Sequence, residues 1–199
     1  MKKECRLSIA VGAVLVLILI QPALADVTNG TFDTDLSGWT VDPSNSVIPD
    51  SGAALFFQTS TDHSVLSQEF LIDPLSLTLS LDVVMNVEGE GGAETDHFTA
   101  KLLDELDQPV APISLEGYFA RLDGGTAGTF SDTFNVPVSS LIGQEVTLIL
   151  DLFHDDDDFE TTAIVDNVSV SVVPVPGAFV LGSLGLGLAG WRLRKRRPI

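Results

Sequence analysis

The chain has 199 residues, a length that suggests one domain with short appendages. Its formal net charge is −18, and the acidity is concentrated in residues 26–172, which hold 27 acidic residues against only Lys101 and Arg121, a formal charge of −25. Such a surface repels nucleic acid and anionic membranes, so nucleic-acid binding is excluded.

Residues 1–25 have the pattern of a signal peptide. "MKKECR" is a basic start, Leu7–Ile20 is an apolar run of secretory length, and the small residues of Ala23–Ala25 predict cleavage before Asp26. The alternative is an uncleaved membrane anchor. The single cysteine, Cys5, lies in this segment, so the mature chain is expected to contain neither a disulfide nor a thiolate metal site.

The region that follows predicts β-structure. "LTLSLDVVMN" (77–86) alternates strictly between apolar and polar residues, and "EVTLILDLFH" (145–154) is apolar on both faces over its middle, as in a buried strand. Five further runs share this strand-like composition: Ala53–Thr59, Val65–Ile72, His97–Leu103, Thr129–Val136 and Thr161–Val173. Gly, Pro, Asp and Ser clusters separate them, and no segment keeps a helical period. We therefore expect an all-β fold, a single antiparallel β-sandwich of about eight strands over residues 26–172.

Asp166 is the most informative polar residue of the last strand. It shares the parity of Ile164, Val168 and Val170, which predicts a carboxylate on the core-facing side. Such a carboxylate is costly unless it is paired, and the scarcity of basic residues favours a hard cation such as Ca²⁺. The alternative is a hydrogen-bonded Asp at a bulge or a strand start, where the apparent inward parity is misleading.

Two stretches resemble the opening and closing strands of galactose-binding-like jelly-roll modules, a group that includes many carbohydrate-binding modules. They are "NGTFDTDLSGWT" (29–40) and "AIVDNVSVSV" (163–172). The resemblance implies a jelly roll with Trp39 in the core. It also implies a structural Ca²⁺ that joins the first strand to the last, with ligands from Thr31, Asp33 and Asp166.

Other polar clusters give less specific signals. Tyr118, Phe119 and Arg121, in the loop-like "LEGYFARLDGG", are candidate glycan-binding residues, because an arginine beside an aromatic ring can hydrogen-bond a sugar. Asp155–Asp158 with Glu160 predicts a solvated turn, with a second cation site as the alternative. His63, His97 and His154 are scattered, and no nucleophile elbow or zinc-protease motif is present, so we expect no enzyme activity.

The C-terminal segment 173–199 has three parts. A Pro-x-Pro motif comes first (Val173, Pro174, Val175, Pro176 and Gly177), then an apolar stretch, 178–193, predicted as a short transmembrane helix, and then a basic tail (Arg192, Arg194, Lys195, Arg196 and Arg197). This layout resembles the PEP-CTERM sorting signal of bacterial exosortase substrates, although Val175 stands where that motif usually has Glu. The resemblance implies an exosortase-like membrane protease as a partner. A plain C-terminal anchor is the alternative.

The combined expectation is a non-catalytic exported protein, held in the membrane before processing and then placed in the outer envelope or the extracellular matrix, in association with exopolysaccharide. One alternative is a calcium-stabilised carbohydrate-binding module with a specific glycan ligand. Another is a small secreted hydrolase or lyase, for which the sequence shows no constellation.

Overall fold

A computed structural model of the chain describes residues 27–58, 62–90, 96–110, 116–124, 126–154 and 160–172. These residues form ten strands and one short 3₁₀ turn, η1 (Ser139–Leu141). The strands are β1 (Thr40–Asp42), β2 (Val47–Asp50), β3 (Ala53–Phe57), β4 (His63–Leu71), β5 (Ser76–Glu90), β6 (His97–Leu103), β7 (Ala120–Asp123), β8 (Thr126–Pro137), β9 (Glu145–Phe153) and β10 (Thr161–Val172).

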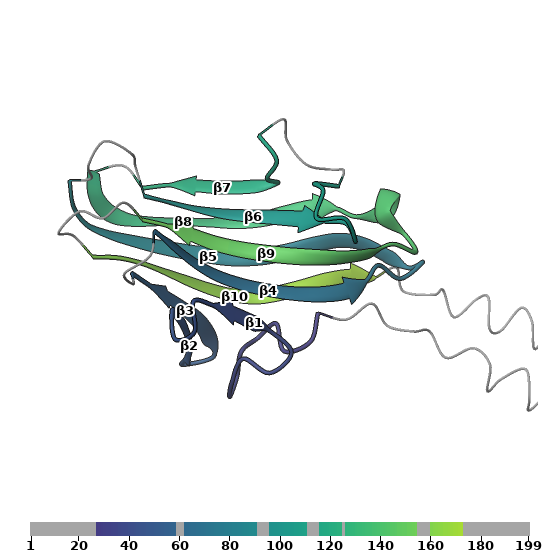
Figure 1. The fold of residues 1–199 in the computed structure, drawn as a ribbon, viewed down its shortest axis with the longest axis horizontal. Helices are drawn as coiled ribbons and strands as arrows, with labels where there is room; N and C mark the ends of the chain where they lie inside the picture. Colours follow the sequence, from purple (N-terminus) through teal and green to yellow (C-terminus); the bar gives the residue numbers. More distant parts are fainter. Residues whose placement is uncertain are drawn as a thin grey trace, which may run out of the picture.

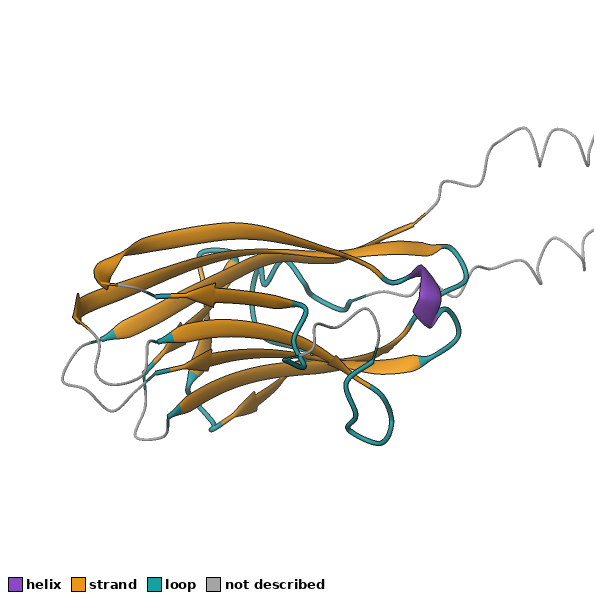
Figure 2. Ribbon diagram, turned by 90° about the horizontal axis from the view of Figure 1, so that it is seen from above, coloured by secondary structure: helices purple, strands orange, loops and turns teal. Residues whose placement is uncertain are grey.

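The strands make two five-stranded sheets that face each other (Figures 1 and 2). The strand order is β1-β4-β9-β6-β7 in the first sheet and β2-β3-β10-β5-β8 in the second. Every pairing is antiparallel. From β3 to β6, and again from β7 to β10, each strand lies in the sheet opposite to that of its predecessor, as in a jelly roll. The expected all-β antiparallel sandwich is confirmed.

All seven strand-like runs of the sequence are strands, and His97–Leu103 has the bounds that the sequence predicts. The short strands β1, β2 and β7 were not expected. Each has three or four residues at or next to a sheet edge, too few for alternation to show. The prediction of a loop at Arg121 is therefore wrong, because this residue lies within β7.

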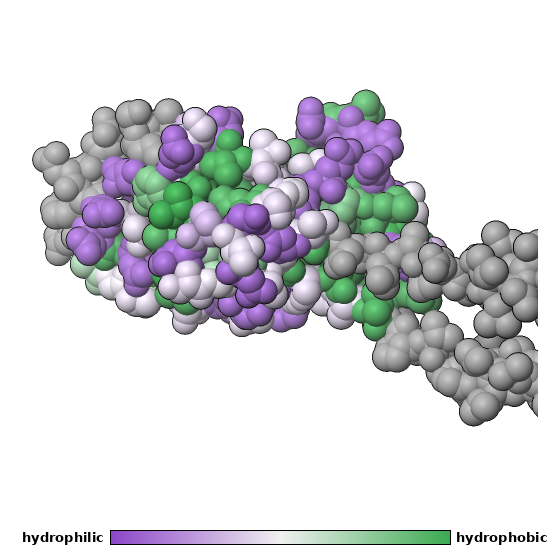
Figure 3. Space-filling model, turned by 90° about the horizontal axis from the view of Figure 1, so that it is seen from below, coloured by the Kyte–Doolittle hydropathy of each residue, from purple (hydrophilic) through white to green (hydrophobic). Residues whose placement is uncertain are grey.

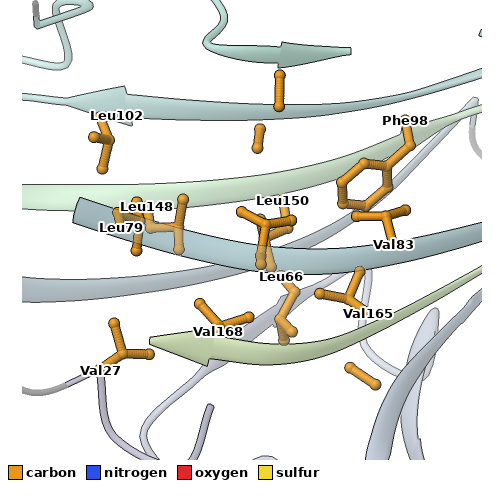
Figure 4. Close-up of a cluster of buried hydrophobic side chains, with 14 of the residues drawn as sticks. Val27, Leu66, Leu79, Val83, Phe98, Leu102, Leu148, Leu150, Val165 and Val168 are labelled. Carbon is orange, nitrogen blue, oxygen red and sulfur yellow. The ribbon is translucent and has the colours of Figure 1, made fainter. Parts of the chain in front are cut away.

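The core fills the space between the sheets, and each long strand except β10 contributes one side-chain parity to it (Figure 4). β9 contributes Val146, Leu148, Leu150 and Leu152, all at most 1% exposed, which leaves its other parity for the outer face. Trp39 is 8% exposed and belongs to this core, as the sequence predicts. At about 25 cal/mol per Å² of apolar surface, this burial is the main favourable term in folding.

β10 contains a bulge that reverses its parity. Asp166 is opposite Asp82 and Ser169 is opposite Ser80, so β10 has one more residue than β5 over this interval. The irregularity includes Asn167, whose φ is 54°. As a result Val165 and Val168 both point into the core (Figure 4), while Asp166 is partly exposed. The prediction of a core-facing Asp166 is wrong, and the alternative of a hydrogen-bonded Asp at a bulge is confirmed, since its Oδ1 accepts from the Asn167 backbone N–H.

The opening motif is packed against this bulge. A Cβ on Gly30 would lie 1.8 Å from the carbonyl oxygen of Val168, so only glycine fits there, and the Gly30 carbonyl accepts a bond of 2.9 Å from the Val168 N–H. Phe32 is fully buried, with its ring centroid 5.3 Å from that of Trp39. The Trp39 indole N–H donates to the Thr28 carbonyl at 2.9 Å. The motif thus joins the first segment of the domain to the last strand.

Three expectations fall outside the described residues: the signal peptide 1–25, the turn Asp155–Asp158 and the C-terminal segment 173–199. Within the described parts of the chain, no helix is long and apolar enough to cross a membrane.

Candidate functional site

A row of three aromatic rings crosses the outer face of the first sheet. β9 is the central strand, and its last residue, Phe153, is directly opposite His63 of β4 on one side and His97 of β6 on the other. The Phe153 ring lies 4.8 Å from the His97 ring in a stacked arrangement and 5.2 Å from the His63 ring in an edge arrangement. We call His63, Phe153 and His97 the ring row.

A polar row lies beside the ring row, two residues further along each strand. Asp151 of β9 is opposite Thr99 of β6, which in turn is opposite Arg121 of β7. Asp151 and Thr99 are only 7% and 4% exposed, although they share the outward parity of Phe153 and His97. They form the floor of the site.

Asp151 connects the two rows through its two carboxylate oxygens. The His63 Nδ1 lies 2.9 Å from one oxygen, and the Lys101 Nζ lies 3.6 Å from the other. A nearly buried carboxylate needs such partners, because an unpaired charge in a region of low dielectric constant is costly. The same contacts fix the positions of the His63 and Lys101 side chains on the surface of the sheet.

Arg121 closes the site on the β7 side. Its Nε donates to Asp123 at 2.5 Å, and its guanidinium lies 5.7 Å from the centre of the Tyr118 ring, within cation–π distance. The hydrogen bond with Asp123 raises the pKa of Arg121, so the guanidinium stays charged. This arrangement offers N–H donors beside an aromatic ring.

One face of the first sheet therefore has, on it or beside it, both basic residues of the domain, two of its three histidines and its only tyrosine. Such a set of rings, N–H donors and carboxylate acceptors can bind a sugar chain, whose pyranose rings have apolar C–H faces and rims of hydroxyl groups.

Tyr118 and Arg121 are together, as the sequence predicts, but Phe119 packs against the hydrophobic core. Sequence reasoning missed the ring row, Asp151 and Lys101. The sequence did indicate part of this face, since His97, Thr99 and Lys101 share one parity of a strand whose bounds were predicted correctly. The pairing of β4 and β6 with β9 could not be obtained without the register.

The proposed calcium ligands lie on two segments that the Gly30–Val168 bond holds together. The Thr31 hydroxyl donates to Asp33 at 2.9 Å, and Asp166 takes the backbone N–H of Asn167. Among the described residues, no group of three or more His, Cys, Asp or Glu side chains converges as metal ligands. Since Asp166 also faces outward, its burial no longer argues for a cation.

No protein-family model matches the sequence, and the comparison with curated proteins gave no match. Similar solved structures include a CBM4 carbohydrate-binding module, with 17% identity, covering 74% of this chain and 99% of the module, and a TM-score of 0.44. A CBM61 module in complex with β-1,4-galactotriose has 13% identity, covers 77% and 99%, and has a TM-score of 0.46. A CBM28 module, described as specific for non-crystalline cellulose, has 12% identity, covers 76% and 98%, and also has a TM-score of 0.46. At these identities and TM-scores the similarity carries no argument about ligand or activity.

Proposed function

We propose that this protein is a non-catalytic glycan-binding module, and that the glycan lies along the ring row and the polar row of the first sheet. The observation that carries the proposal is the juxtaposition of Phe153, His63 and His97 with a floor of Asp151 and Thr99. Rings supply an apolar contact for the sugar faces, and the charged groups beside them supply donors and acceptors for the hydroxyls.

The glycan is expected to be neutral. The domain has a formal charge of −25, and even the candidate face pairs its cations with Asp151 and Asp123. A polyanionic chain would therefore be repelled at low ionic strength, whereas hydroxyl groups can bond to both the paired cations and the carboxylates.

The test is retention of the purified chain on immobilised β-1,4-galactan, xylan and non-crystalline cellulose, with alginate as the acidic comparison. Phe153→Ala is expected to weaken binding about tenfold or more, because truncation of a central aromatic contact costs upwards of about 1.4 kcal/mol. Phe57→Ala is the matched control, since Phe57 is also a half-buried phenylalanine, on a strand of the other sheet. Equal losses in the two variants, or binding to alginate alone, would contradict the proposal.

We also propose that the protein is exported and sorted by its C-terminal segment into the envelope or matrix. The support comes from the sequence: the signal-peptide pattern, the Pro-x-Pro motif, the apolar stretch 178–193 and the terminal basic residues. Intact mass of the protein from envelope fractions would test it, because an exosortase-like protease should remove the residues after the Pro-x-Pro motif. Calcium binding by Thr31, Asp33 and Asp166 stays a separate prediction, which calorimetric titration with calcium would test.

A further inference from the structure

Exposed hydrophobic side chains gather at one end of the sandwich. Among the described residues, six large hydrophobic side chains are exposed, and five of them lie where β4 ends and where β5 and β9 begin. These five are Leu71, Leu77, Leu106, Ile142 and Val172. We call them the apolar end. The sixth, Ile48, is on β2, away from this cluster.

The strand register and the backbone hydrogen bonds from Val138 to Leu77 and from Gly143 to Ile72 place the five residues at the same end of the sandwich. Leu71 is opposite Glu145, and Val172 is opposite Ser76, next to Leu77. Leu106, at the tip of the turn after β6, lines a cavity of about 320 Å³ with Gly143 and Glu145, which places it beside the segment that contains Ile142. Leu106 is 77% exposed, a high value for a leucine, and single exposed apolar residues are common whereas clusters are not. Figure 3 shows hydrophobic surface at this end, next to the place where the described chain stops.

The same end is where β10 stops (Figure 1). Val172 is the last described residue, and the sequence places only 173–177 between it and the apolar stretch 178–193. Two prolines in five residues predict an extended linker of about 15 Å, at about 3.1 Å per residue. The headgroup layer of a bilayer is about 5 to 8 Å thick on each side, so the linker can hold the domain against the membrane surface but not far from it.

We infer that the apolar end is a membrane-contact surface, which lies on the bilayer while the C-terminal segment anchors the chain. Leu106 and Ile142 enter the interface between headgroups and acyl chains. Asp104, Glu105 and Glu145 lie beside Leu106, so this surface suits zwitterionic lipids and is repelled by anionic ones. The ring row lies at the other end of β9, about 25 Å away at about 3.3 Å per residue, and is thus held clear of the membrane.

The test uses the full chain with Cys5→Ser, reconstituted in phosphatidylcholine vesicles that contain a lipid with a quencher near the headgroup. One variant carries a fluorophore at Leu106→Cys, and the control carries it at Asp62→Cys, an exposed position at the opposite end. The Leu106 label is expected to lose most of its emission and the Asp62 label to keep it. Addition of phosphatidylglycerol should weaken the effect at Leu106.

Trp191 reports insertion of the C-terminal segment in the same samples, because Trp39 is buried and inaccessible to lipid. Quenching of Trp191 without quenching at Leu106 would overturn the inference, and so would equal quenching of both labels. If the Leu106 label becomes less exposed to water as the protein concentration rises, in samples without vesicles, the surface would be assigned to a second copy of the chain instead. Failure of all quenching would refute the anchored arrangement on which the inference depends, whatever the glycan assay shows.

Discussion

Replacement of Gln68 by leucine should destabilise the first segment of the domain, residues 27–39. Gln68 is 5% exposed on β4 and makes three hydrogen bonds with its side-chain amide. Its Oε1 accepts from the Thr28 N–H at 2.8 Å, and its Nε2 donates to the carbonyls of Thr28 and Gly38, both at 2.9 Å. Leucine fills a similar volume but can make none of these bonds.

The expected loss of stability follows from these bonds. Three hydrogen bonds at about 1 kcal/mol each give an upper value of about 3 kcal/mol. Thr28 and Gly38 are exposed, so water can replace part of what they lose, and we expect about 2 to 3 kcal/mol. For a domain of this size that corresponds to a fall in Tm of roughly 5 to 10 °C.

The assay is denaturant unfolding of the purified chain followed by hydrogen exchange. The exchange of amides in residues 27–39 should accelerate more than that of β9. Glu69→Gln, at the exposed neighbouring position, is the control and should change stability by less than about 0.5 kcal/mol. Because Trp39 also donates to the Thr28 carbonyl, Gln68→Leu and Trp39→Phe should not be additive. If Gln68→Leu lowered the stability as little as the control does, the conclusion that Gln68 holds residues 27–39 in place would be refuted.

Three further substitutions test the structure. Gly30→Ala should cost about 2 to 4 kcal/mol in the free energy of unfolding, since its Cβ would lie 1.8 Å from a backbone oxygen of β10. Gly143→Ala, with open space but a φ of 79°, should cost only about 1 kcal/mol, and the reverse order in a thermal melt would contradict the packing described. Hydrogen bonds from Thr133 and then Asn167 lower the pKa of Asp82 below its ordinary 3.8. The stability this gives is complete well above pH 3.8 and is lost as the pH falls through the folded-state pKa. Asp82→Asn should therefore be less stable than the parent at pH 7, and the difference should shrink on acidification below about pH 4; an acid titration in which it stays constant or grows would contradict this assignment.

The sequence predicted the fold where a strand is long enough for its alternation to be visible. His97–Leu103 has the expected bounds, and Trp39 lies in the core. The alternation failed at Asn167, because one extra residue in a bulge exchanges the two faces of everything after it. For this reason the sequence pattern predicts a buried carboxylate at Asp166, whereas in the structure Asp166 is partly exposed.

The candidate site was harder to predict than the fold. Tyr118 and Arg121 are three residues apart, so their proximity could be read locally. The three rings come from different strands that are far apart in the chain, and only the register of β4, β9 and β6 brings them together. A single sequence contains no direct measure of that register.

The central position of β10 has a mechanical consequence. β10 has β3 on one side and β5 on the other, and its end leads directly into the C-terminal segment. A force transmitted through Val172 therefore acts along the strand and loads the bonds to both neighbours in parallel, whereas an edge strand could be peeled off one bond at a time. Because the Val168 N–H is hydrogen-bonded to the Gly30 carbonyl, the first segment of the domain also bears part of this force. A protein held at a surface by this end would resist traction on a glycan chain bound at the other.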